Sequence, residues 1–218
     1  MTPILYGHPF SSYTWKALIP LYANEVPFVF EELSVDGGGT AWEFVREASP
    51  LGKFPVLSDG GHIVFEATAI IEHLVVHHLP DAGLIPADPD KAVVTRQMDR
   101  VFDNYVMNLM QESVTEAILK GGKPDSAVLA GVNERLERVY AWLDGWLESY
   151  DRPEGVTLIE CAAAPSLFYA DWVHQITDQW SRLRDWRAHL LALPAVSQCV
   201  EDARPFRPNF PLGAPDRD

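Results

Sequence analysis

The sequence is poor in cysteine and in basic residues. Its 218 residues include only two cysteines, Cys161 and Cys199, too few for a disulfide scaffold or a cysteine-rich zinc site. Lysine and arginine total 17 against 31 aspartate and glutamate residues, which gives a formal net charge of -14. Such a chain repels phosphate backbones and anionic membrane surfaces, so we expect neither nucleic acid nor a membrane as a partner.

Long apolar runs are also missing. No stretch approaches the roughly 18 apolar residues of a membrane span. The opening residues, MTPILYGHPF, lack the basic segment and apolar segment of a signal peptide, so we expect a cytoplasmic protein with reduced thiols. Hydrophobic residues make up 47% and charged residues 22%, the composition of a folded globular protein.

Two patterns divide the chain. Residues 1–80 alternate short β-type runs with helical spacing in the order β-α-β-α-β-β-α, whereas residues 90–218 are mostly helical. The join at residues 81–89 breaks both patterns with prolines and a glycine, as linkers do. The sequence therefore predicts an α/β domain, a linker and an all-helical domain.

Periodicity and capping signals predict the individual elements. Strands are expected over residues 3–6, 28–30, 55–57 and 62–65, with helices over 11–22, 40–47 and 66–78. The second part predicts one long helix over 90–119, another over 126–150, and shorter ones from 157, over 180–193 and over 195–202. Thr157 and Glu160 have the spacing of a capping box, and Thr40 is a candidate N-cap. The proline-rich tail, 205–215, is not expected to be helical.

The turn between the first strand and the first helix, residues 10–15 (FSSYTW), is the first candidate site. Thiol–disulfide proteins of this layout place Cys-x-x-Cys there, whereas this chain has Ser11 and Ser12. A serine hydroxyl can donate a hydrogen bond to a thiolate that a ligand brings. With the helix dipole, it would lower the thiol pKa from about 8.5 towards neutrality. The alternative is ordinary N-capping by serine.

Residues 49–57 (SPLGKFPVL) form the second candidate. A proline at the start of a strand is either an edge residue or part of a cis turn. A cis bond between Phe54 and Pro55 would turn the Phe54 backbone outward, where it can pair with an extended peptide ligand. Lys53 could hold a carboxylate of that ligand. The alternative is a plain turn with a solvated Lys53.

Residues 65–71 (FEATAII) form the third candidate. Glu66 lies where a strand passes into a helix, so its carboxylate can bind an ammonium group while the helix N–H groups bind a carboxylate. Together they would grip an amino-acid head group. The alternative is a terminal glutamate that compensates the helix dipole.

Two other groups of side chains are interpreted as structural. His73 and His77 are spaced i, i+4, with His78 beside them, but nothing nearby in the sequence completes a metal shell, so no metal is expected. Tyr6 fits the pattern of the first strand.

The order and spacing of these motifs resemble the cytosolic glutathione transferase family over nearly the whole chain. Residues 4–18 look like the family's first strand, active-site turn and first helix, and the serine-type turn is nearest the zeta class. Residues 49–57 look like the segment with the cis-proline, and 65–74 like the stretch that grips the γ-glutamyl end. Residues 157–165 look like the capping box of the central helix in the all-α domain.

The resemblance implies a thioredoxin-like N-terminal domain with glutathione as co-substrate. Ser11 would stabilise the thiolate, or Ser12 if the loop is shifted by one residue. The Phe54 backbone would pair with the cysteinyl part of glutathione, with Pro55 cis, and Lys53 would hold the glycyl carboxylate.

The γ-glutamyl end would bind to Glu66 and to the backbone N–H of Ala67. The family usually has serine after the glutamate, and its replacement here removes one hydroxyl contact, worth about 1–2 kcal/mol. Backbone donors can compensate for that loss.

The implied reaction is attack of the glutathione thiolate on an electrophilic hydrophobic substrate, as in detoxification, by a homodimer. The substrate would lie between the domains, against His8, Phe10, Phe102, Tyr105, Val106 and Leu109, with the aromatic tail nearby. The alternatives are a glutathione-dependent isomerase or peroxidase, and a non-catalytic binding protein, which the alanine at position 67 favours. A disulfide reductase ranks last because it needs a cysteine in the turn.

Overall fold

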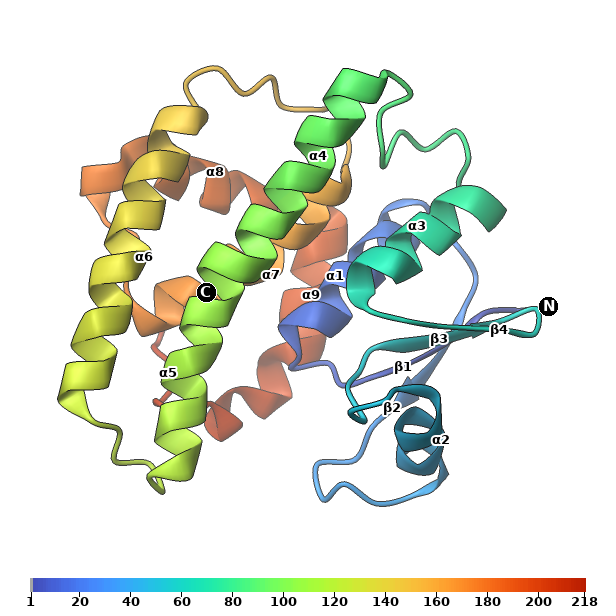
Figure 1. Ribbon diagram of the computed structural model, residues 1–218, viewed down its shortest axis with the longest axis horizontal. Coiled ribbons are helices and arrows are strands. Elements are labelled where there is room, and N and C mark those ends of the chain that lie inside the picture. Colours follow the sequence, from blue (N-terminus) through green and yellow to red (C-terminus); the bar gives the residue numbers. More distant parts are fainter. Residues whose placement is uncertain (1) are drawn as a thin grey trace.

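The computed structural model describes residues 2–218, and its first part alternates strands and helices. The elements are β1 (Ile4–Gly7), α1 (Ser12–Ala23), β2 (Val29–Glu32), α2 (Thr40–Ala48), β3 (Val56–Asp59), β4 (His62–Phe65) and α3 (Ala67–His77). This is the predicted β-α-β-α-β-β-α order, with boundaries displaced by one or two residues (Figure 1).

The four strands form one mixed sheet in the order β2-β1-β3-β4. Strand β1 pairs parallel to β2 and antiparallel to β3, which pairs antiparallel to β4. Successive side chains of a strand point to opposite faces, so Leu57 packs in the core that includes α1 and α3 while Val56 packs with Val45 of α2. Helices α2 and α3 accordingly lie on opposite faces of the sheet (Figure 1). The arrangement is that of a thioredoxin-like α/β unit.

The N-terminus of α2 corrects one prediction. Its N-cap is Gly39, at φ 91°, and Thr40 is already the first helical residue. Glycine suits this position because only a residue without a Cβ adopts that backbone conformation without strain.

The second part is helical, as predicted. Its elements are α4 (Pro89–Val101), η1 (Phe102–Met107), α5 (Asn108–Leu119), α6 (Ser126–Trp146), α7 (Leu158–Val173), η2 (Asp178–Trp180), α8 (Ser181–Ala192), α9 (Pro194–Ala203) and η3 (Arg204–Asn209). The helix predicted over 90–119 is continuous but contains a π-helical segment, η1, between α4 and α5. None of the helices described over residues 2–218 has both the length and the apolar character needed to cross a membrane.

Helix α7 is the centre of the helical part. The predicted capping box is present, because Thr157 caps the helix and the Glu160 carboxylate accepts from the Thr157 backbone N–H at 2.9 Å. Tyr150 adds a 2.6 Å hydrogen bond to the same carboxylate. Nearly every residue of α7 is buried, and the helix packs along α1, with Trp15 completely buried near the contact.

The tail corrects a second prediction, since η3 is a short 3-10 helix inside the segment expected to be non-helical. Proline at its start costs no hydrogen bond, because the first N–H groups of a helix have no partner within it.

Candidate active site

A cleft of about 260 Å³ lies at the N-terminus of α1, between the sheet side and the helical part. Its lining comes from three regions: the β1–α1 turn with Phe54, helix α5, and α7 with the tail. The residues are Phe10, Ser11, Ser12, Tyr13, Phe54, Met110, Gln111, Val114, Tyr169, Asn209, Phe210 and Pro211. The structure thus brings the predicted Phe10, Ser11, Ser12 and Phe54 together.

Ser11 is the N-cap of α1, and Ser12 is its first helical residue. The Ser11 Oγ accepts a hydrogen bond from the Thr14 backbone N–H at 3.3 Å. Because the hydroxyl is used there as an acceptor, its own proton stays available for donation into the cleft. The first N–H groups of α1 and the positive end of its dipole lie at the same place. The arrangement therefore favours an anion, such as a thiolate.

The turn is held closely against α1. The His8 backbone N–H donates to Thr14 Oγ1 at 3.3 Å. A Cβ built on Gly7 would lie only 2.7 Å from Thr14 Cγ2, so this approach requires glycine at the end of β1.

The helical part also fixes the turn. Tyr169 in α7 donates a 2.9 Å hydrogen bond to the Phe10 carbonyl oxygen, and the two rings meet edge to face at 5.5 Å. Within the first part, Trp15 Nε1 of α1 also donates to the Pro9 carbonyl oxygen at 2.6 Å. The position of the serines thus depends both on a neighbour in α1 and, through Tyr169, on a residue far away in the sequence.

His8 lies beside the cleft and is not among its lining residues. Its Nδ1 accepts from the Phe10 backbone N–H at 3.0 Å, and its ring meets Phe206 edge to face at 4.6 Å. Burial lowers the pKa of His8 below its ordinary value of 6.5, although the Glu32 charge acts in the opposite direction. A neutral ring is also what the accepting Nδ1 requires.

The peptide bond between Phe54 and Pro55 is cis, as the resemblance implied. The Phe54 ring packs edge to face on Trp42 at 5.4 Å and borders the cleft. Lys53 is exposed, and its backbone N–H donates to Ser49 Oγ at 3.1 Å.

Glu66 is the N-cap of α3 and is exposed. Its φ of 70° lies in the left-handed region, which costs a residue other than glycine about 1–3 kcal/mol and often marks a functional position. Its carboxylate makes no capping hydrogen bond to α3 and lies at the N-terminus of that helix, where its charge also compensates the helix dipole. Ala67, next to it, is buried.

A buried charge cluster beneath this helix start was not predicted. Lys16 of α1 is 1% exposed, and its Nζ lies 2.5 Å from Asp99 Oδ1, 2.7 Å from Asp103 Oδ2 and 2.9 Å from Thr68 Oγ1. It thereby joins α1 to the first turn of α3 and to the long helix. The charges of Asp103 and Glu66 add to burial in raising the pKa of Tyr13, so this cleft phenol stays protonated.

Besides His8, four of the predicted substrate contacts lie outside this cleft. Phe102 and Val106 are completely buried in the core, where Phe102 packs on Trp186 at 5.7 Å. Tyr105 and Leu109 border a different hollow, against α6. A π-helical turn holds more residues than an α-helical turn, so η1 rotates all that follows relative to a regular helix.

Helix α5 consequently presents Met110, Gln111 and Val114 to the cleft. The i, i+4 spacing of Met110 and Val114 is visible in the sequence, but the rotation that selects this face is not. Phe210 reaches the cleft from the tail, as the suggestion of a nearby aromatic tail anticipated.

A second hollow, the two cysteines and Tyr6 all lie apart from the cleft. A larger hollow of about 510 Å³ lies at the opposite end of α1, near Tyr22, and contains none of the predicted site residues. Both cysteines are buried away from the cleft, and burial raises the pKa of each thiol. Tyr6 stacks on Phe44 at 4.3 Å under α2.

Comparison with known proteins identifies the N-terminal domain. The sequence model of the glutathione S-transferase N-terminal domain matches residues 5–79, the part that carries the two serines, Phe54 and Glu66. Residues 5–79 thus carry a glutathione S-transferase N-terminal domain. Glutathione S-transferase F6 of Arabidopsis thaliana is 25% identical to it, over 90% of this chain and 98% of that protein.

Similar proteins include one named as an isomerase and solved structures named as transferases. Probable maleylacetoacetate isomerase 2 of Drosophila melanogaster is 22% identical over 98% of this chain and 90% of its own length. Among solved structures, glutathione transferase E6 of Drosophila melanogaster superposes with a TM-score of 0.81 over 98% of this chain and 99% of that one, at 20% identity. Glutathione transferase URE2P6 of Phanerochaete chrysosporium, in complex with oxidized glutathione, gives 0.79 over 93% and 97%, at 16% identity.

Proposed function

We propose that this protein is a glutathione transferase that stabilises the glutathione thiolate with Ser11. The carrying observation is the Ser11 hydroxyl, which borders the cleft at the N-terminus of α1 and already accepts from Thr14. Its proton can be donated to a sulfur anion beside it. The hydrogen bond and the helix dipole both favour the charged form, so they lower the thiol pKa.

The rest of the glutathione molecule extends from this point along the N-terminal part. The Phe54 backbone, with Pro55, pairs with the cysteinyl part, and Lys53 attracts the glycyl carboxylate. Glu66 binds the γ-glutamyl ammonium group, and the N–H of Ala67 with its neighbours in α3 binds the carboxylate. Support comes from the unusual backbone of Glu66 and from a carboxylate that does not cap its own helix.

The reaction is bond formation between the sulfur and an electrophilic carbon. The sulfur supplies the electron pair, the leaving group departs with its own pair, and the thiol proton goes to solvent. The protein contributes thiolate stabilisation and the relative position of the reactants. Met110, Val114 and Phe210 provide an apolar wall for a hydrophobic electrophile in the cleft.

These roles divide the chain at the predicted linker. Residues 1–80 bind glutathione, and residues 90–218 provide the wall of the electrophile site. We further propose a cytoplasmic homodimer that acts in detoxification. Support for the dimer comes from exposed apolar side chains on β4, α3 and α4, namely Ile63, Phe65, Val76, Val93 and Val94. Light scattering coupled to size exclusion tests the dimer directly.

The thiolate proposal is tested with two ligands and two variants. Glutathione added to the protein should produce thiolate absorbance near neutral pH, and Ser11→Ala should lose it. S-methylglutathione has no thiol, so it should bind both proteins equally. Ser12→Ala is the matched control and should keep the thiolate. If Ser12→Ala loses the signal and Ser11→Ala keeps it, the assignment is wrong.

A glutathione-dependent isomerase is the second candidate. The favouring observation is the match to maleylacetoacetate isomerases, one of them over 98% of this chain. In such a reaction the sulfur–carbon bond forms, the adduct rotates, and the bond breaks again, so glutathione is regenerated. Measuring glutathione consumption with chlorodinitrobenzene and with maleylacetoacetate separates transfer from isomerisation. If the protein binds glutathione but accelerates neither reaction, a non-catalytic binding role replaces both.

A further inference from the structure

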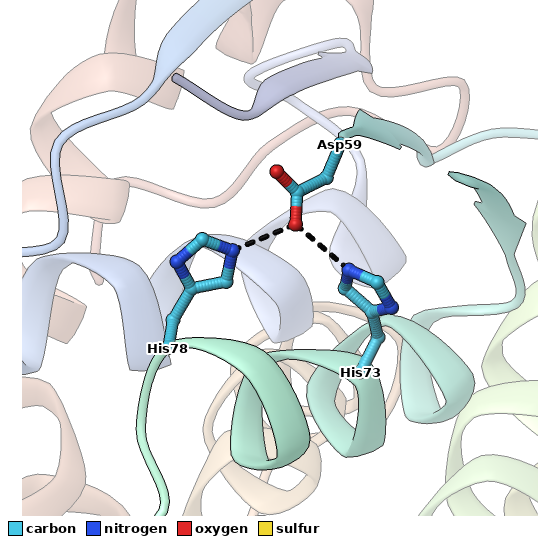
Figure 2. Close-up of side chains that lie close together, drawn as sticks. All are labelled: Asp59, His73 and His78. Carbon is cyan, nitrogen blue, oxygen red and sulfur yellow. Dashed lines mark hydrogen bonds and ion pairs between the residues drawn. The ribbon is translucent and has the colours of Figure 1, made fainter. Parts of the chain in front are cut away.

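Asp59, His73 and His78 meet at the far end of α3 from Glu66 (Figure 2). The Asp59 Oδ2 atom lies 2.9 Å from His73 Nε2 and 2.7 Å from His78 Nε2. The three ligand atoms lie within 4.8 Å of one another. The carboxylate and the His73 ring are almost completely buried, whereas the His78 ring is partly exposed.

Two further imidazole rings border this group. His77 lies 4.3 Å from His73 between ring centroids, and His62 of β4 lies 5.6 Å from His73 and 5.5 Å from His77. Four histidines and one buried aspartate therefore gather where the β3–β4 hairpin meets the end of α3. The chain has only seven histidines, so more than half of them lie here.

The geometry depends on where α3 ends. His78 is the C-cap residue, with φ -128° and ψ -30°, so it no longer follows the helix. On a continuous helix, residues five apart point in different directions. Because α3 stops at His77, the His78 side chain can turn back towards the face that carries His73. The hairpin then brings Asp59 between them, as Figure 2 shows.

The donor set suits a borderline divalent metal ion. Neutral imidazole nitrogen and carboxylate oxygen bind Zn²⁺ at about 2.0–2.2 Å, usually in a tetrahedral arrangement. Ligand atoms around such an ion lie somewhat over 3 Å apart. The nitrogen–oxygen separations need to widen by only a fraction of an ångström, within the range of side-chain rotation.

The electrostatics also favour a cation. An ion bound by two neutral imidazoles and one carboxylate keeps a net positive charge, and the acidic chain around it compensates that charge. Imidazole-rich sets select zinc, copper or nickel over magnesium or calcium, which prefer oxygen ligands.

We propose that Asp59, His73 and His78 form a binding site for a divalent transition-metal ion, best matched by Zn²⁺. This differs from the expectation drawn from the sequence, where the carboxylate that completes the set could not be recognised. Three protein ligands leave a fourth position, open to water or to the neighbouring His77 or His62 ring. The ion would link the hairpin to the end of α3. The site is independent of glutathione binding, which the proposed function places at the other end of that helix.

Calorimetric titration of the tag-free, chelator-treated chain with Zn²⁺, without glutathione, tests the site. We expect one ion per chain. His78→Ala removes a partly exposed ligand and should weaken binding at least about tenfold, since even loss of outer partners costs about 10–100-fold. His189→Ala, an exposed histidine on α8, is the matched control and should bind as the wild type does.

Co²⁺ provides a second readout, because its visible absorption reports nitrogen and oxygen ligands directly. The wild type and His189→Ala should show the absorption, and His78→Ala and Asp59→Asn should not. Circular dichroism identifies any variant that fails to fold. The proposal is overturned if the wild type takes up no Zn²⁺, or if folded His78→Ala binds both ions as tightly as His189→Ala. In that case the cluster is only a hydrogen-bonded contact between the hairpin and the helix.

Discussion

The hydroxyl of Tyr169 donates a 2.9 Å hydrogen bond to the carbonyl oxygen of Phe10, across 159 residues of sequence. The donor belongs to the most buried helix of the second part, and the acceptor precedes the two serines of the cleft. The position of the proposed thiolate donor is therefore set partly from the helical part of the chain.

Tyr169→Phe should reduce kcat/KM for glutathione conjugation about five- to tenfold. It removes one hydrogen bond, worth about 1 kcal/mol, and lets the turn move relative to the electrophile wall. Tyr22→Phe is the matched control, since Tyr22 donates a comparable 3.0 Å bond to Asp202 at the opposite end of α1. Both variants should lose similar stability in urea unfolding, and equal activity in the two would show that the Tyr169 contact does not position the turn.

Lys16→Met should destabilise the fold by about 3 kcal/mol. The variant removes the buried cation between Asp99 and Asp103, whereas the half-exposed Arg100 still pairs with both carboxylates, so the cost lies at the low end of that for a broken buried ion pair. Lys123→Met, at an exposed position, should change stability by less than about 0.5 kcal/mol. Chemical denaturation of both proteins measures the difference.

The same variant should lose less stability in acid. Burial raises the pKa of Asp103, although Lys16 acts in the opposite direction. The native state therefore holds this proton more tightly than the unfolded chain does, so native stability gains as the pH falls through the raised pKa. The penalty of Lys16→Met should be smaller at about pH 5 than at about pH 8. An equal penalty at both would contradict this origin of the instability.

Local signals in the sequence were sufficient for the order of elements in the first part and for the capping box at Thr157. Each depends on neighbours a few residues away, through alternation, helical spacing or a side chain that reaches its own helix end. The position of Ser11 and Ser12 at the start of α1 is predicted for the same reason, because serine at the start of a helix is a local signal.

The missed features are those that depend on distant contacts. Nothing near Lys16 in the sequence shows that it is buried, because its partners Asp99 and Asp103 come from α4 and η1. Tyr105, which the family resemblance placed at the cleft, lies within the π-helical segment and borders a different hollow. Nothing in the sequence indicates that Asp59 and His78 are in contact, because the contact forms only when the β3–β4 hairpin packs on the end of α3. Periodicity describes single elements and contains no information on how two elements meet.

The turn should also lose stability in mild acid through His8. Its pKa in the folded protein is lowered by burial, below the ordinary 6.5, so the unfolded chain takes up the proton first. Stability from this group is present above about pH 6.5 and declines as the pH falls towards the lowered value. Protonation of Nδ1 would also break the bond from the Phe10 N–H.

His8→Asn should flatten this pH dependence, because the asparagine Oδ1 can accept the same N–H without titrating. Melting temperatures between about pH 5 and pH 8 measure the effect, with His189→Asn as a matched control that keeps the wild-type slope. If the slope of His8→Asn matches that of the control, the acid sensitivity arises elsewhere.

The size of the electrophile should be limited by helix α5. Val114 lines the cleft, whereas Tyr105, which the family resemblance placed there, borders a different hollow against α6. Val114→Phe adds volume to the wall and should lower kcat/KM for a bulky electrophile about tenfold, the scale at which apolar pockets discriminate size. A small electrophile should react at nearly the wild-type rate. Tyr105→Trp adds volume outside the cleft and should leave the kcat/KM of both substrates unchanged. If Tyr105→Trp lowers kcat/KM for the bulky electrophile and Val114→Phe does not, the electrophile binds beside Tyr105 instead.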